Sequence, residues 1–398
     1  MKIGILGAFS RYNYGDVLMP YIVSESLKKR MSGISFEFYS YKESDLTEIG
    51  GIPSKSLKDL YLDSDNLDWV IVAGGQVFGQ EHKGMYVLEF DMNHPKRTYF
   101  AEICFKVLGK ICGSVVNAYC RRRIGAKSSY PWVVEKPFDG NKIIYNTVGG
   151  NFNSFKKDKR YVSMINTLSK SPMIAIRSLR DYNIWKTVLN NVSLIPDSVS
   201  VISDIYNDQK LGQLCQAKNK KKIDELKSYF VFQISRENAK NREEELAAVL
   251  EEACKINDLK CLLVPMGYAA GHEDQIACRN INTLTSPNVE ILDKASIFDI
   301  TYALSQAQAY LGTSLHGAIV SCSYGVPHST IIVNNKKTEE YITNWKTSLA
   351  PACDIENIPK TLHRILESDS KKYTKNKSKE IITMINDNFD KICKIMNN

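Results

Sequence analysis

Short apolar runs alternate along the chain with longer amphipathic stretches, which is the pattern of strands followed by helices. The first apolar run, residues 2–6, leads into a loop, and a helix is predicted from about 17 to 30. Further strands are predicted at 34–39, 68–73, 142–148, 173–176, 192–195, 229–234, 260–265, 289–292, 308–311 and 330–333. Because strands that alternate with helices pair in parallel, the pattern predicts an α/β fold with parallel sheets.

A polar stretch at 203–227, rich in Asn, Gln and Lys, separates two such series. We interpret it as a linker between an N-terminal Rossmann-like domain, residues 1–202, and a C-terminal one, residues 228–355. A Lys-rich helical tail is predicted from 356 to 398. The predicted architecture is two parallel-sheet domains that face each other across a cleft, as in GT-B glycosyltransferases, and this alone says little about chemistry.

The stretch from 309 to 327 carries the clearest chemical signal. A strand is predicted to end at Gly312, to turn through Thr313 and Ser314, and to enter a helix of small residues that Gly325 and Pro327 end. The N-terminus of such a helix stabilises an anion through its dipole and its backbone N–H groups. His316 stands there, either as a proton donor to a bound anion or as a side chain that satisfies the turn backbone.

The loop after the first strand contains Asn13, Gly15 and Asp16. Asp16 is interpreted either as the N-cap of the next helix or as a carboxylate that binds sugar hydroxyls or accepts a proton. The loop lacks the GxGxxG fingerprint, and Asp16 would repel a pyrophosphate, so a nicotinamide cofactor is not expected.

Other strand ends carry residues suited to a ligand. Gly74 and Gly75 let the backbone approach a ligand closely or simply turn, and Gln76 follows them. Arg177 comes directly after a strand, where it could grip a phosphate or carboxylate with two N–H bonds or form a surface salt bridge. We expect the strand-end loops to converge, with Asp16, Gly75, Gly149 and Arg177 from the first domain and Arg236, His272 and His316 from the second.

Composition narrows the choice of partners. The net charge of +8 over 398 residues suits anionic substrates or membranes but is too diffuse to indicate nucleic acid. The ten Cys never occur as CxxC, which argues against a zinc site and against a disulfide scaffold. Met1 leads straight into a strand and no long apolar run follows, so we expect neither a secretory signal nor a membrane span, and a cytoplasmic location.

Residues 97–125 combine apolar residues at helical spacing with basic side chains, among them Arg121, Arg122 and Arg123. The stretch is too charged to span a membrane. It is interpreted either as a core helix with a solvated basic end or as a peripheral contact with the inner face of the plasma membrane.

Several motifs occur in a recognisable order: Tyr12-Asn13-Tyr14-Gly15-Asp16, Gly74-Gly75, Ala175-Ile176-Arg177-Ser178, Pro196-Asp197, Ser314-Leu315-His316-Gly317 and Gly325-Val326-Pro327. Together they resemble the polysaccharide pyruvyl transferase family from residue 1 to about 346, with an unfamiliar insertion near 97–140. The resemblance implies a GT-B-like fold, phosphoenolpyruvate as co-substrate without a further cofactor or metal, and a sugar diol of an exopolysaccharide, a capsule or a lipid-linked precursor as acceptor. It also implies that His316 is the catalytic His and Arg177 the donor-binding Arg.

The chain departs from this family at one position. Many members have Arg two residues before the catalytic His, where this chain has Ser314. The lost positive charge should weaken donor binding unless Arg236, His272 or Lys336 replaces it, and the alternative is that the donor or the reaction has changed in this chain. With Thr313, Ser314 and Arg177, these three residues form the predicted donor side. The predicted acceptor side lies in the N-terminal domain and comprises Asn13, Gly15, Gly75 and Gln76, with Asp16 as a base or positioning group.

Two alternatives stay open at this point. The first is a GT-B glycosyltransferase of polysaccharide biosynthesis that uses a nucleotide sugar. The second is a non-catalytic, membrane-associated scaffold of glycan assembly, whose site is degenerate because Ser314 replaces the Arg.

Overall fold

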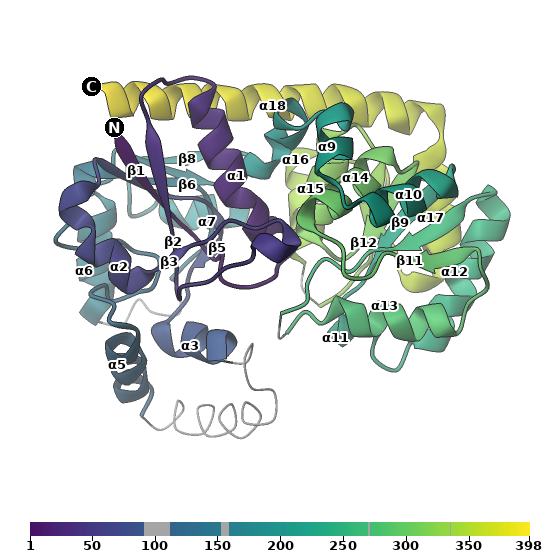
Figure 1. The fold of residues 1–398 in the computed structure, drawn as a ribbon, viewed down its shortest axis with the longest axis horizontal. Coiled ribbons are helices and arrows are strands. Elements are labelled where there is room, and N and C mark those ends of the chain that lie inside the picture. The colour runs from purple at the N-terminus through teal and green to yellow at the C-terminus, as the bar shows by residue number, and fades with distance from the viewer. Residues whose placement is uncertain (91–111, 153–158, 270, 335) are drawn as a thin grey trace. The chain divides into compact units, whose positions relative to one another are not determined.

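The computed structural model describes residues 1–90, 112–152, 159–269, 271–334 and 336–398 (Figure 1). The chain divides into two compact units. Unit 1 comprises Met1–Thr47, Gly51–Ser198 and Asp387–Asn398, and unit 2 comprises Glu48–Gly50 and Val199–Asn386. Each unit is built on its own parallel sheet, so the α/β class predicted from the sequence is confirmed.

Unit 1 contains an eight-stranded sheet in the order β3-β2-β1-β4-β6-β7-β8, with β5 paired to β6, and all of its described strand pairs are parallel. The strands are β1 (Lys2–Leu6), β2 (Ser35–Ser40), β3 (Lys55–Ser56), β4 (Trp69–Val72), β5 (Gly75–Phe78), β6 (Ile143–Gly150), β7 (Met173–Ile176) and β8 (Val192–Leu194). Strands β6 and β7 are buried along their whole length, as expected for central strands of a parallel sheet. The sequence pattern missed the short strands β3 and β5.

Helices connect these strands: α1 (Tyr14–Lys28), α2 (Leu57–Leu62), α3 (His82–Phe90), α5 (Gly113–Ile124), α6 (Lys159–Leu168) and α7 (Leu179–Trp185). An aromatic cluster lies in the core of the unit. The ring of Phe78 lies 5.0 Å from that of Trp185 and 5.5 Å from that of Tyr145, measured between centroids. These contacts pack β5, β6 and α7 together, which is where the candidate site of unit 1 begins.

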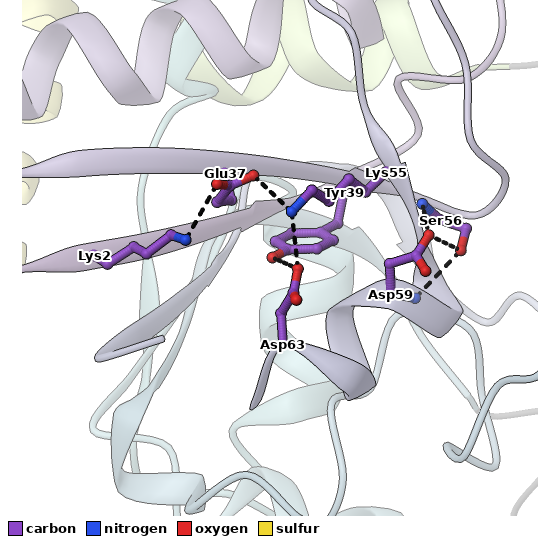
Figure 2. A network of polar contacts seen from close by, with 7 residues as sticks. All are labelled: Lys2, Glu37, Tyr39, Lys55, Ser56, Asp59 and Asp63. Carbon is purple, nitrogen blue, oxygen red and sulfur yellow. Dashed lines mark hydrogen bonds and ion pairs between the residues drawn. The ribbon is translucent and has the colours of Figure 1, made fainter. Parts of the chain in front are cut away.

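A network of hydrogen bonds and ion pairs links β1, β2 and β3 at the edge of this sheet (Figure 2). The Lys55 amine lies 3.1 Å from Glu37 Oε2 and 3.0 Å from Asp63 Oδ2, and Lys2 Nζ lies 3.2 Å from Glu37 Oε1. The Tyr39 hydroxyl donates to Asp63 Oδ2 at 2.8 Å. That hydrogen bond and the Lys55 charge hold the pKa of the Asp63 carboxyl below its usual value.

Ser56 begins α2 in the same network (Figure 2). Its hydroxyl accepts from the Asp59 backbone N–H at 3.2 Å, while the Asp59 carboxylate accepts from the Ser56 backbone N–H at 3.1 Å. This reciprocal capping box explains why so short a helix starts where it does.

Unit 2 contains a five-stranded parallel sheet in the order β11-β10-β9-β12-β13. Its strands are β9 (Tyr229–Gln233), β10 (Lys260–Leu263), β11 (Val289–Ile291), β12 (Ala309–Gly312) and β13 (His328–Thr330). The helices that accompany them are α11 (Arg236–Ala239), α12 (Glu243–Asn257), α13 (Asp274–Thr283), α14 (Ile297–Gln306), α15 (Leu315–Ser323) and α16 (Lys337–Trp345).

The stretch predicted as a linker, residues 203–227, is instead largely helical and counts with unit 2. It contains most of α8 (Ile202–Ile205) together with α9 (Asp208–Leu214) and α10 (Ala217–Leu226). Leu211, Ile223 and Leu226 are buried. The polar composition concealed these few apolar anchors, so the division falls between residues 198 and 199 and not at 202.

The C-terminal residues form α17 (Ile358–Leu366) and α18 (Ser368–Asn397), so the prediction of a helical tail agrees with the structure. Ile365, Ile381 and Ile385 are buried, as their spacing indicated. The tail is not a separate part, however, because α18 contributes residues up to Asn386 to unit 2 and its last turns to unit 1.

Candidate functional site

Each sheet has one point where its strand order reverses direction. In unit 1 this point lies between β1 and β4, and in unit 2 it lies between β9 and β12. Loops that leave the carboxyl ends of the two strands flanking such a point form the usual ligand crevice of an open α/β sheet.

In unit 1 the loop after β1 approaches the turn after β4. The Asn13 side-chain amide donates to Asp16 Oδ2 at 2.8 Å. Gly74 and Gly75 both have positive φ, +108° and +85°, and a Cβ atom on Gly75 would lie 3.3 Å from Asp16 Oδ1. The structure thus brings Asn13, Asp16 and Gly75 together, as the acceptor-side prediction requires. Their role in binding an acceptor stays a prediction.

The interpretation of Asp16 as a helix N-cap is wrong. Helix α1 begins at Tyr14, three residues earlier than predicted, and Asn13 occupies the cap position without a side-chain cap bond. Asp16 therefore lies in the first turn, where the helix dipole stabilises a carboxylate. Gly15 is buried in the same turn. Asp16 is half-buried. Its carboxylate is oriented by the hydrogen bond from Asn13 and stabilised by the start of the helix.

Gln76 and Arg177 meet beside the glycines that end β6. A Cβ atom on Gly149 would lie 3.0 Å from both Gln76 Oε1 and Arg177 Nε. One guanidinium nitrogen of Arg177 (Nη1) lies 2.5 Å from Asp197 Oδ2, and the two residues are only 5% and 0% exposed. The expectation of a surface salt bridge is thus half right, because Arg177 is paired but the pair is buried.

Asp181, which the sequence analysis did not single out, fixes the turn that ends β6. Its carboxylate accepts from the Gly150 backbone N–H and from the Asn151 side-chain amide, both at 2.8 Å. Trp185 Nε1 donates to the Gly150 carbonyl at 2.9 Å. Gly150 has φ of +95°, and a Cβ atom there would clash with the Phe78 carbonyl oxygen. The Ser178-x-x-Asp181 spacing at the start of α7 was the available signal for this residue.

In unit 2 the predicted strand–turn–helix is confirmed. Strand β12 ends at Gly312, and α15 starts at Leu315 with Ser314 as N-cap, whose Oγ accepts from the Gly317 N–H at 3.2 Å. His316 is the second residue of the helix and is 7% exposed. Gly317 is required for space, because a Cβ atom there would overlap the Tyr310 hydroxyl.

Two residues that the sequence analysis missed hold this turn. Gln233, the last residue of β9, accepts through Oε1 from the backbone N–H groups of Thr313 (3.0 Å) and Ser314 (2.7 Å) and from the Thr313 hydroxyl (3.2 Å). Its Nε2 donates to Asp274 Oδ2 at 2.7 Å. Burial raises the pKa of the Asp274 carboxyl to about 6, although its hydrogen bonds oppose this shift. The Thr313 hydroxyl and the Ser314 cap are thus engaged inside unit 2.

Arg236 and His272 also lie together in unit 2. The Arg236 backbone N–H donates to the His272 carbonyl at 3.1 Å, and its side chain forms an exposed ion pair with Glu273, also at 3.1 Å. Both line a surface hollow of about 370 Å³ with Lys240, Gly271, Ile276, Asn280 and three acids, Glu237, Glu243 and Glu273. The acids offset the positive charge, which weakens the case for this hollow as the replacement anion site.

Lys336, the third candidate cation, is exposed at the start of α16. Two residues further on, the Thr338 hydroxyl donates to the Thr313 carbonyl at 2.9 Å. The start of α16 therefore lies against the turn that precedes His316. In unit 1 the structure brings Asp16 near Asn13 and Gly75, and Gln76 near Arg177. In unit 2 the hollow at Arg236 and His272 is not lined by Thr313, Ser314, His316 or Lys336. The proposal that both units serve one donor stays a prediction.

Among the residues that the structure describes, no group of three or more His, Cys, Asp or Glu side chains is arranged to hold a metal ion. No helix in the described ranges is both long enough and apolar enough to cross a membrane. Residues 97–111 of the predicted membrane contact lie outside the described part of the chain, and α5 covers most of the remainder.

Solved structures share the architecture at low sequence identity. UDP-GlcNAc 2-epimerase from Neisseria meningitidis, bound to UDP-GlcNAc, matches with a TM-score of 0.55 and 13% identity over 100% of this chain and 99% of its own. The enzyme of that name from Methanocaldococcus jannaschii matches with a TM-score of 0.53 and 12% identity over 93% and 94%. An α-glucosyltransferase in complex with UDP and a 13-mer DNA matches with a TM-score of 0.50 and 12% identity over the full length of both chains. These likenesses show a GT-B fold.

No curated protein matches the chain. A family model, however, matches residues 13–335, a span that includes the loop with Asn13 and Asp16, the buried Arg177 and the turn before His316. This span covers well over half of the chain and includes both strands at the reversal point of unit 2, β9 and β12. The match confirms the resemblance read from the motifs, and the chain belongs to the polysaccharide pyruvyl transferase family.

Proposed function

We propose that this transferase moves the pyruvyl group of phosphoenolpyruvate onto two hydroxyls of one sugar in a cell-surface glycan or its lipid-linked precursor, giving a pyruvate ketal and phosphate. The observation that carries the proposal is the buried His316 at the N-terminus of α15, within the span of the family match. Helix N-termini favour anions, and phosphoenolpyruvate carries both a phosphate and a carboxylate.

The first step of the proposed reaction is the protonation of a carbon atom of the donor. Protonation of the methylene carbon of phosphoenolpyruvate gives an oxocarbenium-like centre, which one sugar hydroxyl attacks as it loses its proton. Phosphate then leaves with the electrons of its C–O bond, and the second hydroxyl attacks the resulting oxocarbenium carbon and loses its proton, which closes the ketal. His316 is the proposed general acid, a role that contributes about 10²–10⁴-fold to the rate.

Arg177 is the proposed partner of the donor anion. Its guanidinium is fixed by Asp197 and by packing against Gly149, so little side-chain entropy is lost when an anion binds. The Asp197 carboxylate also offsets the positive charge that Arg177 presents to the donor. We therefore propose that Arg177 orients the donor with Gln76 beside it, and that Arg236, His272 or Lys336 supplies the positive charge lost at Ser314.

Asp16 is proposed to position an acceptor hydroxyl or to take its proton. The carboxylate is oriented by the Asn13 amide, and Gly75 leaves room next to its second oxygen. A carboxylate with one fixed and one approachable oxygen suits a sugar hydroxyl, which needs an acceptor on one side only. Thr313 and Ser314 then act on the donor indirectly, through the shape of the turn.

The acceptor side of the proposal includes a membrane contact through α5. Val115 and Tyr119 stand one turn apart and are 67% and 56% exposed, and Arg122 and Arg123 follow towards the helix end. Residues 112–127 contain basic but no acidic side chains. An apolar pair beside arginines suits an anionic lipid surface, where a lipid-linked sugar would be anchored.

Vesicle sedimentation tests this contact. The protein should sediment with vesicles that contain anionic lipid and should lose at least half of that binding when Arg121, Arg122 and Arg123 are changed to Gln. Changing Lys218 and Lys221 of α10 to Gln, as a charge control, should have little effect. Binding that ignores the arginines would refute the contact.

Phosphate release tests the reaction itself. The purified protein is incubated with phosphoenolpyruvate and candidate glycans while phosphate is measured and the product is examined for a ketal by mass spectrometry. His316→Ala should abolish turnover without unfolding, whereas His363→Ala, at an exposed histidine of α17, should not. Near-normal turnover in His316→Ala would refute its role.

The same purified protein can be used to distinguish a nucleotide-sugar glycosyltransferase from the proposed pyruvyl transferase. A glycosyltransferase should be protected against heat by uridine or guanosine diphosphate, and the proposed pyruvyl transferase by phosphoenolpyruvate. No turnover with either donor, together with vesicle binding, would favour the scaffold.

A further inference from the structure

The turn before His316 is fixed from two sides. Its backbone N–H groups at Thr313 and Ser314 are taken by the Gln233 side chain. Its carbonyl oxygens accept from hydroxyls, Gly312 from Thr330 at 2.9 Å, Thr313 from Thr338 at 2.9 Å and Ser314 from Tyr310 at 3.2 Å. A turn with so many of its polar groups engaged is held in one conformation.

The orientation of the Gln233 amide is itself imposed. Asp274 Oδ2 accepts from Gln233 Nε2 and also from the backbone N–H groups of Met266 (3.0 Å) and Gly267 (3.1 Å). A carboxylate can only accept, so the amide nitrogen must face Asp274 and the amide oxygen must face the turn. A flipped amide would set its oxygen against the carboxylate and its nitrogen against two N–H groups.

Both side chains are withdrawn from solvent. Gln233 is 3% and Asp274 1% exposed, and the second carboxylate oxygen, Oδ1, has no hydrogen-bond partner within the described residues. A buried carboxylate needs hydrogen bonds to offset its lost hydration, and those from Gln233, Met266 and Gly267 supply them here.

The pair also lies at the reversal point of the sheet. Gln233 on β9 is opposite Gly312 on β12 in the parallel register, and these two strands flank the point where the order reverses. The chain of contacts therefore runs from Asp274 at the start of α13, through Gln233, to the residue that caps α15. His316 is two residues beyond that cap.

We propose that Gln233 and Asp274 are positioning residues that hold the 312–314 turn, and through it the imidazole of His316, in the geometry for proton transfer to the donor. This inference rests on the proposed role of His316 as general acid. It also means that the Thr313 and Ser314 amides shape the site and do not themselves bind the donor anion. Displacement of a catalytic group by about 1 Å can lower a rate about 10²-fold.

The first test compares turnover of Gln233→Ala with that of Gln213→Ala, a matched change at an exposed position of α9. Gln233→Ala should lower kcat about 10–100-fold with a much smaller change in KM for phosphoenolpyruvate, because orientation is lost and not donor charge. Gln213→Ala should behave like the wild type. A kcat for Gln233→Ala within twofold of the wild type would overturn the proposal.

A second pair of variants separates positioning from bulk stability. Gln233→Glu keeps the side-chain length but sets a carboxylate against Asp274, and it should be as impaired as the Ala variant. Asp274→Asn alone can keep all three hydrogen bonds through its amide oxygen and should therefore be much less impaired than Gln233→Glu. A purely structural role predicts that kcat follows the folded fraction, measured by circular dichroism, in all of these variants.

Amide hydrogen exchange gives a readout that needs no activity. Gln233→Ala should speed exchange at Thr313 and Ser314 at least tenfold and shift the ring resonance of His316, while Gln213→Ala should do neither. If the wild type releases no phosphate from phosphoenolpyruvate, the proposed function fails, and the exchange data still decide whether the pair positions His316. Unchanged exchange and an unshifted ring would overturn the positioning role.

Discussion

The buried ion pair of unit 1 permits a sharp test. Asp197→Ala removes the carboxylate that lies 2.5 Å from the Arg177 guanidinium and leaves the arginine in place. Neither side chain is more than 6% exposed, so solvent cannot replace the lost partner without local opening. The change therefore tests how much the ion pair contributes to the stability of unit 1, which contains the proposed donor-binding arginine.

The expected loss is large. Removing one partner of a buried ion pair typically costs about 3–5 kcal/mol, because the remaining charge has lost its compensation. Domains are stable by only about 5–15 kcal/mol, so unit 1 should lose about a fifth or more of its stability. Asp197→Asn keeps a hydrogen-bond acceptor and should cost less, about 1–3 kcal/mol.

Urea unfolding followed by tryptophan fluorescence measures this loss in the relevant unit. Three of the four tryptophans, Trp69, Trp132 and Trp185, belong to unit 1. Asp65→Ala, at an exposed position, serves as the control and should change stability by no more than about 0.5 kcal/mol. A loss below about 1 kcal/mol in Asp197→Ala would refute the account of a tightly coupled buried pair.

Two further predictions concern stability. Burial lowers the pKa of His328 to about 4, so between pH 6.5 and 4 the unfolded chain binds a proton that the folded one does not, and stability should fall as the pH falls. His328→Gln should flatten that dependence in urea midpoints measured across the window, and an unchanged slope would contradict it. In the network of Figure 2, Lys55→Met should cost about 0.5–1.5 kcal/mol in low salt, since each half-exposed pair contributes about 0.2–1 kcal/mol. That difference should shrink in 1 M salt, and a cost independent of salt would argue against an ionic origin.

The strand and helix pattern predicted the fold because parallel sheets bury their strands on both faces. Runs such as residues 143–145 and 229–232 are apolar for that reason and stand out from the helices between them. The helices at 208–226 were missed because only a few apolar anchors hold them, amid a polar composition that also suits a linker. The first residue of a helix was harder to predict. Asn13 and Asp16 are both residue types that favour the N-cap position, and the structure begins α1 at Tyr14, after Asn13.

The sequence predicted those site residues whose flanking residues in the chain indicate their role. His316 follows a Gly-Thr-Ser turn, and Arg177 follows an apolar strand. Gln233 and Asp274 gave no such signal, because a glutamine at a strand end and an aspartate at a helix start are ordinary in isolation. Their contact joins residues 41 positions apart and depends on the order β10-β9-β12, which no local pattern encodes.

The central claim is that Arg177 and His316 act on the same donor molecule. Binding of phosphoenolpyruvate to the wild type, Arg177→Met, His316→Gln and the double variant, measured by calorimetry with Arg180→Met as the control, tests it most directly. If the two residues share one donor, each single change should weaken binding and the two effects should not be additive, with a coupling of at least about 0.5 kcal/mol. Additive effects within about 0.3 kcal/mol, or unchanged binding in either single variant, would contradict it.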